Sequence, residues 1–246
     1  MIYDIAGLRV RLDNKFPFTE KFCKEYLSEN QDLPADIVAG VTDEEFAEEK
    51  LQSPGFSDGY IENICLYRSL CKQLPTLKRM LLHCSVLEHD GKGYAFLGRS
   101  GTGKSTHTKL WLKYLDKTRV INGDKPILQA TESGFIAYGT PWQGKEGWGC
   151  KAAIPLCGLC FLEQAKENSI KPLKPSEAAA LLFRQILFPD VEEQATATLD
   201  LADALVTKIP AYLLKCDISE TAVKTAFEAM TALSFDTCKK GEEYEN

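Results

Sequence analysis

The sequence of 246 residues lacks several features that mark particular classes of protein. No run approaches the ~18 consecutive apolar residues of a membrane-spanning helix. Basic residues are not in excess, because 29 Lys and Arg stand against 35 Asp and Glu, and the net charge of −6 argues against a nucleic-acid-binding protein. The start of the chain carries Asp4 and Arg9 rather than a basic segment followed by a long apolar one. We therefore expect a cytoplasmic protein with no membrane and no nucleic acid among its partners.

The cysteines form no pattern typical of disulfides or of structural zinc. Their number, nine, is odd, and they are scattered through predicted strands and helices, which indicates reduced thiols. Cys157 and Cys160 are closely spaced and Cys150 precedes them, but a closed zinc site needs four ligands and no second closely spaced pair exists. The run from Ala152 to Leu162 is mostly apolar, so we expect these thiols to be small core residues of a strand.

The remaining composition is that of an ordinary globular protein, with 44% hydrophobic and 26% charged residues and without repeats. The length suffices for one medium α/β domain, or for a core with a small appendage. We expect a β-containing N-terminal subdomain over residues 1–58, packed on a core over residues 59–235. Residues 236–246 are expected to be a C-terminal tail, frayed over 241–246.

Residues 98–105 read GRSGTGKS and fit the pattern Gly-x-x-x-x-Gly-Lys-Ser. Glycines at three of these positions let the backbone form a nest of N–H groups around phosphate oxygens, and the following helix adds the positive end of its dipole. Lys104 can bridge the β- and γ-phosphates of ATP, and the Ser105 hydroxyl can hold Mg²⁺. A short apolar strand over 94–97 and a helix over 106–115 supply the expected flanks. The predicted nucleotide-binding residues are Gly98, Ser100, Gly101, Thr102, Gly103, Lys104, Ser105 and Thr106, the last toward the α-phosphate.

A second strand is predicted over residues 81–87, separated from the first by a segment containing Asp90-Gly91, a strong hairpin signal. The strand before the phosphate loop therefore has an antiparallel neighbour, and the sheet is mixed. With Asp90 and Gly91 as the turn, His83 lies opposite Gly98, which makes His83 a candidate catalytic residue. A lone His on an apolar strand is otherwise more often a core residue.

Downstream, residues 118–124 predict a strand that ends in Asn122-Gly123-Asp124. One helix and one return strand fit between Lys104 and Asp124, so Asp124 is expected beside the phosphate loop. A carboxylate there can bind Mg²⁺ or act as a base, although the same three residue types are also favoured in plain turns. The catalytic candidates are thus His83, Lys104 and Asp124, and the metal ligands are Ser105 and Asp124.

The run LLHCSVLEHDGKGYAFLGRSGTGKSTHTKLW, followed by VINGD, resembles the catalytic domain of HPr kinase/phosphorylase and its relatives in the phosphoenolpyruvate-carboxykinase-like group of P-loop kinases. The likeness is specific over about residues 80 to 125. It implies an α/β fold with a P-loop kinase core and a mixed sheet. It also implies a histidine on the preceding strand, matched by His83, and a phosphate-loop Lys and Ser, matched by Lys104 and Ser105.

The same resemblance implies an Asp-Asp pair after the next strand, the first residue acting as base and the second binding Mg²⁺. Here the pair is Gly123-Asp124, so the metal ligand is present and the expected base is replaced by glycine. The signature for HPr recognition and phosphorolysis is not evident either. More similar in outline are compact HPr-kinase-like enzymes that phosphorylate peptides or small hydroxyl compounds.

These observations predict an ATP-dependent phosphotransferase that acts on a hydroxyl, a serine of a protein or peptide or a small molecule, with the proton going to Asp124 or His83. Two alternatives stay open. A carboxykinase-like enzyme would need an Arg-rich pocket, and Arg68, Arg79, Arg99 and Arg119 form no recognisable constellation. A nucleotide-binding regulatory module would lack transfer altogether. The sequence also leaves open whether the nucleotide is ATP or GTP, which compound is the acceptor, and whether the protein forms a homo-oligomer.

The segment from Tyr138 to Gly149 contains two Trp, four Gly and Lys145. This composition is typical of a flexible loop that closes over nucleotide or acceptor and excludes water. The alternative is a turn-rich connection whose Trp side chains cap the core.

The other predicted elements are a β element over 3–12, a solvated acidic helix over 43–50, helices over 61–74, 177–188, 201–206 and 220–233, and a strand over 211–215. Pro75 is expected to end the helix over 61–74.

Overall fold

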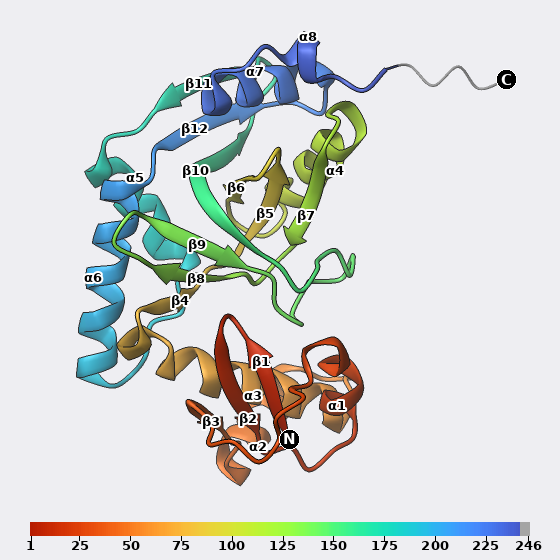
Figure 1. The fold of residues 1–246 in the computed structure, drawn as a ribbon, viewed down its shortest axis with the longest axis vertical. Helices are drawn as coiled ribbons and strands as arrows, with labels where there is room; N and C mark the ends of the chain where they lie inside the picture. Colours follow the sequence, from red (N-terminus) through yellow and green to blue (C-terminus); the bar gives the residue numbers. More distant parts are fainter. Residues whose placement is uncertain (242–246) are drawn as a thin grey trace, which may run out of the picture.

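The computed structural model describes residues 1–241, so the expected fraying of the chain beyond Gly241 lies outside the described residues. The chain forms a small N-terminal part and a larger part built around a nine-stranded sheet (Figure 1). In the described residues no helix is both long and apolar enough to span a membrane.

The large sheet is mixed, as predicted. Its main path runs β4-β8-β9-β10-β6-β5-β7, with β12 beside β10 and β11 beside β12. Strand β10 is parallel to β6 and β12, whereas the remaining pairs are antiparallel. The strands are β4 (Arg79–Leu81), β5 (Cys84–His89), β6 (Lys92–Leu97), β7 (Thr118–Asn122), β8 (Ile127–Ala130), β9 (Phe135–Tyr138), β10 (Ala153–Gln164), β11 (Ser169–Pro172) and β12 (Ala211–Cys216).

The predicted hairpin is confirmed in its register. Cys84 pairs with Leu97 and the turn lies at Asp90-Gly91, both with positive φ, which matches the turn type that tight hairpins favour. The single strand predicted over 81–87 is wrong at its start, because the chain leaves one ladder after Leu81 and enters another at Cys84. In this break the His83 N–H donates to the Gln185 carbonyl at 3.0 Å.

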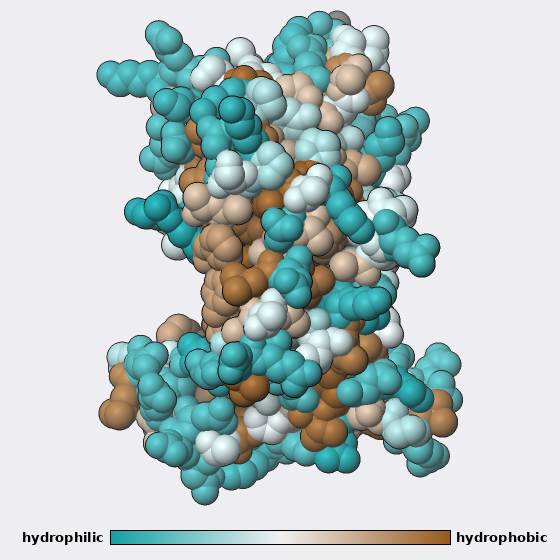
Figure 2. Space-filling model, turned by 90° about the vertical axis from the view of Figure 1, so that its left-hand side faces the viewer, coloured by the Kyte–Doolittle hydropathy of each residue, from teal (hydrophilic) through white to brown (hydrophobic). Residues whose placement is uncertain are grey.

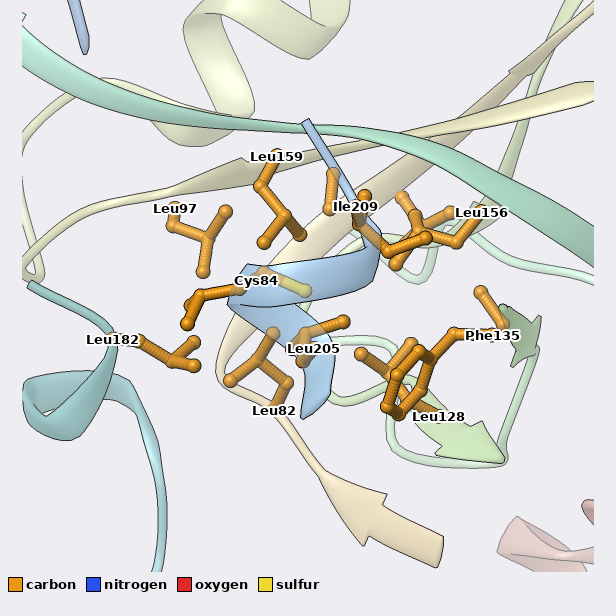
Figure 3. Close-up of a cluster of buried hydrophobic side chains, with 14 of the residues drawn as sticks. Leu82, Cys84, Leu97, Leu128, Phe135, Leu156, Leu159, Leu182, Leu205 and Ile209 are labelled. Carbon is orange, nitrogen blue, oxygen red and sulfur yellow. The ribbon is translucent and has the colours of Figure 1, made fainter. Parts of the chain in front are cut away.

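Both faces of the sheet are covered by helices, because alternate side chains along each strand point to opposite faces. On β6, Tyr94 and Phe96 pack toward α4 and α7, while Ala95 and Leu97 pack toward α5 and α6. Figure 3 shows the second of these clusters, with Leu97 facing Leu182 and Leu205 among other buried side chains. The helices are α4 (Lys104–Tyr114), α5 (Pro175–Leu182), α6 (Glu192–Lys208), α7 (Glu220–Thr231) and α8 (Phe235–Cys238), with a 3₁₀ turn η3 (Phe183–Gln185).

Of the two β10 thiols predicted to be core residues, only Cys160 is buried. Cys160 is fully buried in the core and Cys157 is partly exposed, and all nine cysteines are free. Burial raises the pKa of the Cys160 thiol, so this group stays protonated at neutral pH.

Two predicted helices have different lengths in the structure. The helix expected over 177–188 ends at Leu182 and continues only as η3. The short helix expected over 201–206 is the last part of α6, which begins at Glu192. Its first two turns are polar and Val191 provides no capping side chain, so neither apolar periodicity nor an N-cap marked the start.

The N-terminal part contains a three-stranded sheet of β1 (Ile2–Ile5), β2 (Leu8–Leu12) and β3 (Ile37–Ala39). The predicted single β element over 3–12 is therefore a hairpin with its turn at Ala6-Gly7. Its helices are α1 (Phe18–Phe22), α2 (Asp43–Gln52) and α3 (Asp58–Gln73). The 3₁₀ turn η1 (Lys24–Tyr26) follows α1, and η2 (Pro75–Leu77) follows α3.

Helix α2 is mostly exposed, as expected for an acidic run, except that Glu49 is buried and paired with Arg68. The core of the N-terminal part includes Tyr3 and Leu70 and also takes Ile127 and Trp142 from the larger part. The two parts therefore share buried surface where the molecule narrows, and hydrophobic atoms show at this narrowing in Figure 2.

Candidate active site

Residues 98–103, called here the glycine-rich loop, connect β6 to α4. Gly101 and Gly103 have φ of +80° and +107°, in the left-handed region that side chains disfavour. Gly103 is the N-cap of α4 and offers no capping side chain. The first N–H groups of a helix have no partner within the helix, so this end of α4 can donate to an anion.

Lys104 begins α4 and is only 8% exposed. Its Nζ donates to the Gly98 carbonyl at 2.8 Å, which draws the side chain back over the loop. Burial lowers the pKa of Lys104, and the charge of Asp124 acts in the opposite direction. In the part of the chain that the structure describes, the hydroxyls of Ser105 and Thr106 have no hydrogen-bond partner.

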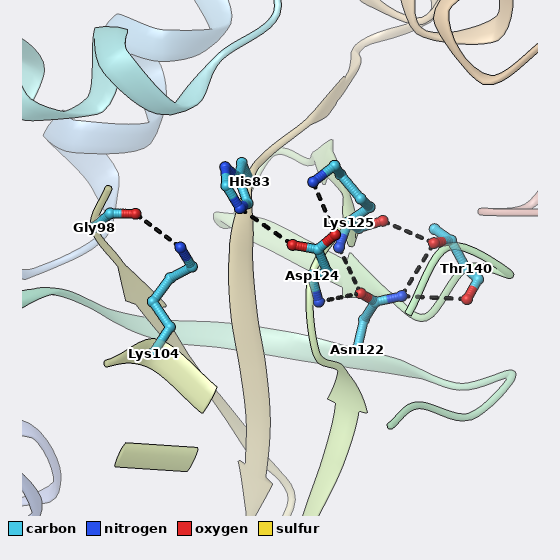
Figure 4. Close-up of polar contacts among 7 residues, drawn as sticks. All are labelled: His83, Gly98, Lys104, Asn122, Asp124, Lys125 and Thr140. Atoms are coloured by element: carbon cyan, nitrogen blue, oxygen red, sulfur yellow. Dashed lines mark hydrogen bonds and ion pairs between the residues drawn. The ribbon is translucent and has the colours of Figure 1, made fainter. Parts of the chain in front are cut away.

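His83 and Asp124 form a hydrogen-bonded pair at the ends of neighbouring strands, with His83 Nε2 3.1 Å from Asp124 Oδ1 (Figure 4). The other carboxylate oxygen, Oδ2, accepts from Lys125 Nζ at 2.9 Å. Burial alone would raise the pKa of Asp124, but the hydrogen bonds and charges of His83 and Lys125 outweigh it and lower the pKa to about 2. Asp124 is therefore ionised at neutral pH.

Asn122 holds the backbone that presents Asp124. Its Oδ1 accepts from the N–H groups of Asp124 and Lys125 at 2.9 and 2.7 Å, and its Nδ2 donates to Thr140 Oγ1 at 3.0 Å. The Asn-Gly-Asp sequence thus serves as a turn, and the turn fixes the direction of the carboxylate.

A pocket of 430 Å³, called here the histidine pocket, joins these groups. It brings together His83, Lys104 and Asp124, which lie far apart in the sequence. Of the predicted nucleotide-binding residues, Gly98 and Thr102 line a neighbouring pocket instead. The full lining is His83, Ser100, Gly101, Gly103, Lys104, Ser105, Thr106, Gly123, Asp124, Gly144, Lys145 and Glu146.

The segment 138–149 has features of both interpretations offered for it. Trp142 is buried against Tyr67, and its Nε1 donates to Asn63 Oδ1 at 2.9 Å, so this tryptophan caps the core of the N-terminal part. Three following residues, Gly144 to Glu146, line the histidine pocket.

Position 123 is tightly enclosed, so an aspartate such as the family resemblance implied would press on the neighbouring backbone. A Cβ added at Gly123 would lie 3.1 Å from the Gln143 carbonyl oxygen and 3.2 Å from that of Trp148. The Gly123 N–H donates to the same Trp148 carbonyl at 2.8 Å. Glycine at position 123 therefore lets the backbone of residues 143–148 approach the chain closely where the family resemblance implies a carboxylate.

Two residues that support the site, Lys125 and Gln185, were not among those predicted from the sequence. Lys125 directly follows Asp124, so a charged contact with the carboxylate could have been predicted from the sequence. Gln185 is buried, and with its amide nitrogen facing inward it donates to the carbonyls of His83 at 3.2 Å and Gly98 at 3.1 Å. No local pattern links Gln185 to these positions.

The oxygen donors of the histidine pocket fit Mg²⁺ better than a transition metal. The described residues contain no group of three or more His, Cys, Asp or Glu that could hold a metal ion. Ser105 and Asp124 both line the pocket, and Mg²⁺ is commonly held by one or two protein oxygens with water and phosphate completing the shell.

Comparison with known proteins identifies one family model that matches residues 61–227, more than half of the chain, and is described as "SynChlorMet cassette protein ScmC". No curated protein matches the chain. Among solved structures, the Hpr(Ser) kinase/phosphatase from Coxiella burnetii is similar with a TM-score of 0.27 and 14% identity, covering 52% of this chain and 88% of that one.

Proposed function

Starting from the premise that the chain belongs to the SynChlorMet cassette protein ScmC family, we propose that it is an ATP-dependent phosphotransferase that moves the γ-phosphate to a hydroxyl group. The observation that carries this proposal is the histidine pocket. There Lys104 and the uncapped start of α4 face the pair formed by His83 and Asp124. Anion-binding groups and a proton-handling pair in one pocket are what phosphoryl transfer needs.

Nucleotide binding is assigned to the glycine-rich loop and the first turn of α4. N–H groups near Gly101 and Gly103 would donate to the phosphates, Lys104 would leave the Gly98 carbonyl for the β- and γ-phosphates, and Thr106 would contact the α-phosphate. Ser105 and Asp124 would hold Mg²⁺, which neutralises charge on the phosphates when bound.

The proton is assigned to His83 rather than to Asp124. A carboxylate with a pKa of about 2 accepts a proton poorly at neutral pH, whereas it orients a histidine well. With Nε2 of His83 donating to Asp124, Nδ1 is left to accept the hydroxyl proton. The bond between the γ-phosphorus and the bridging oxygen breaks, a bond to the acceptor oxygen forms, and ADP leaves.

A second candidate function is favoured by the state of the Asp124 carboxylate. Both of its oxygens already have partners, His83 and Lys125, so a metal ion at Oδ2 would be repelled by the charge of Lys125 unless that side chain moves. If it does not move, the site would bind nucleotide without transfer and act as a regulatory module.

Calorimetric titration of Mg-ATP into the wild type, Lys104→Ala and Lys109→Ala tests the binding step. Lys109 lies exposed on the same helix, outside the histidine pocket, and is the matched control. We expect Lys104→Ala to raise the Kd roughly 10- to 100-fold, because a charge-assisted contact to phosphate is lost. Unchanged affinity in Lys104→Ala would refute nucleotide binding at this loop.

Incubation with γ-labelled ATP, Mg²⁺ and pools of peptides and small hydroxyl compounds tests the transfer step. Labelled acceptor indicates a kinase, labelled free phosphate indicates hydrolysis only, and binding without either indicates the regulatory module. In a transferring enzyme His83→Gln should lose about 100-fold in rate, the scale of an acid–base group. A His83→Gln protein that transfers normally would exclude His83 as the base.

A further inference from the structure

A second pocket, of 610 Å³, lies on the other side of the glycine-rich loop and is called here the arginine pocket. Its walls are residues 98–102 of the loop, residues 161–164 at the end of β10, and the α5–η3 segment near residues 181–185. Ser100 and Gly101 line both pockets, so the two are neighbours across one edge of the loop.

The arginines of the chain divide into two groups. The sequence contains seven, and the guanidinium groups of five of them bond to carboxylates or carbonyls. Over residues 1–241, the guanidinium groups of Arg99 and Arg184 form no hydrogen bond and no ion pair, and both residues line the arginine pocket. They come from the loop and from η3, 85 positions apart, so the fold alone brings these unpaired cations to one cavity.

Much of the rest of the lining is apolar or already engaged in hydrogen bonds. Phe161 and Leu162 form a buried floor. Gln164 Nε2 donates to the Gly101 carbonyl at 3.1 Å, and Gln185 spans the carbonyls of His83 and Gly98, so both amides anchor the wall of the loop. Glu163 is the one carboxylate among the lining residues. The unpaired positive charge of the pocket is therefore that of two guanidinium groups.

We propose that the arginine pocket binds the phosphate acceptor through a carboxylate, and that the acceptor is a small hydroxyl compound carrying one carboxylate. This inference rests on the proposed phosphotransferase function. The planar guanidinium fork matches a carboxylate with two parallel hydrogen bonds, whereas Lys104 suits the phosphates on the other side of the loop. Glu163 disfavours an acceptor with further negative charge. From this position the acceptor hydroxyl reaches across the Ser100–Gly101 edge toward His83.

Matched pairs of acceptors test the assignment. Glycerate and L-serine are compared with their amides, glyceramide and L-serinamide, and phosphorylated product is measured with γ-labelled ATP. We expect at least one acid to be preferred over its amide by about 10- to 100-fold in kcat/KM, the scale of a charged hydrogen-bonding pair. Arg184→Gln and Arg99→Gln should bring this ratio toward one, and Arg184→Lys should retain part of it. Arg119→Gln, an exposed arginine at the far edge of the sheet, should leave it unchanged.

An acid-to-amide ratio near one in the wild type, or a ratio unchanged by both glutamine variants, would overturn the acceptor assignment. Absence of transfer to either acid would overturn it as well. Calorimetry with Mg-ATP on the same preparations separates the two proposals. Nucleotide binding without acid preference refutes the acceptor site alone, whereas absence of nucleotide binding refutes the proposed function itself.

Discussion

The Asp124→Asn substitution should make the stability of the protein less dependent on pH. Asp124 accepts from His83 and Lys125, and its pKa is lowered from the ordinary 3.8 to about 2. That lowering corresponds to about 2.4 kcal/mol of stabilisation at neutral pH, and solvent at a side chain that is 28% exposed reduces it to roughly 1 to 2 kcal/mol. Asparagine keeps the shape of the side chain and removes the charge.

The direction follows from the lowered pKa. The contribution of Asp124 is fully present above about pH 4, where the unfolded chain is also ionised, and is lost as the pH falls from 4 toward 2. Urea denaturation followed by fluorescence of the three tryptophans gives the free energy of unfolding from pH 7 to about pH 3. The difference between wild type and Asp124→Asn should be largest at pH 7 and shrink on acidification.

Asp200→Asn is the control, because Asp200 is an exposed carboxylate on α6 with no hydrogen bond or ion pair in the described residues. A difference for Asp124→Asn that stays constant down to pH 3, or that equals the difference for the control, would refute the electrostatic account of this pair.

Three further predictions concern Gly144, His83 and Trp142. Gly144→Ala and Gly147→Ala should both destabilise the protein by roughly 1 kcal/mol, because both glycines have positive φ. Only Gly144→Ala should also impair transfer, because its Cβ would lie 2.9 Å from Asp124 Cβ, whereas Gly147 has open space. Equal transfer activities of the two variants would contradict this prediction. The NMR signals of the His83 ring should move when a non-hydrolysable ATP analogue binds, because His83 lines the histidine pocket. Signals that do not respond to the analogue would place His83 away from the phosphates. Trp142→Phe should lower the free energy of unfolding by about 1 to 3 kcal/mol, because Asn63 Oδ1 loses a buried donor, and an unchanged urea midpoint would argue against that bond.

Features with short-range causes were predictable from the sequence. Asp90-Gly91 between two apolar runs specified a tight turn, and a tight turn fixes which residues face one another, so the pairing of Cys84 with Leu97 followed. Strand β7, and the place of Asp124 just after it, followed from the same local pattern. Helix α4 was predictable, although it begins at Lys104 rather than at residue 106, because the glycines before it are required by conformation rather than by packing.

Features that depend on distant contacts were not predictable. The break at Leu82-His83 exists because β8 and η3 offer partners far along the chain, and α6 extends to Glu192 without a local start signal. The sequence around Trp142 favoured a flexible loop over a core residue, whereas in the structure Trp142 is buried and donates to Asn63 in the N-terminal part.

The meeting of Arg99 and Arg184 at one pocket is the clearest example of a feature that the sequence could not predict. In the sequence Arg99 and Arg184 are two separate cations, and nothing local distinguishes them from arginines that pair with a nearby carboxylate. Only the packing of η3 against the glycine-rich loop places both at one cavity. The sequence alone therefore determined the strand, turn and helix that carry the candidate site, because those depend on neighbouring residues. The tertiary structure decided which side chains share a pocket, because that depends on the burial of surfaces far apart in the chain.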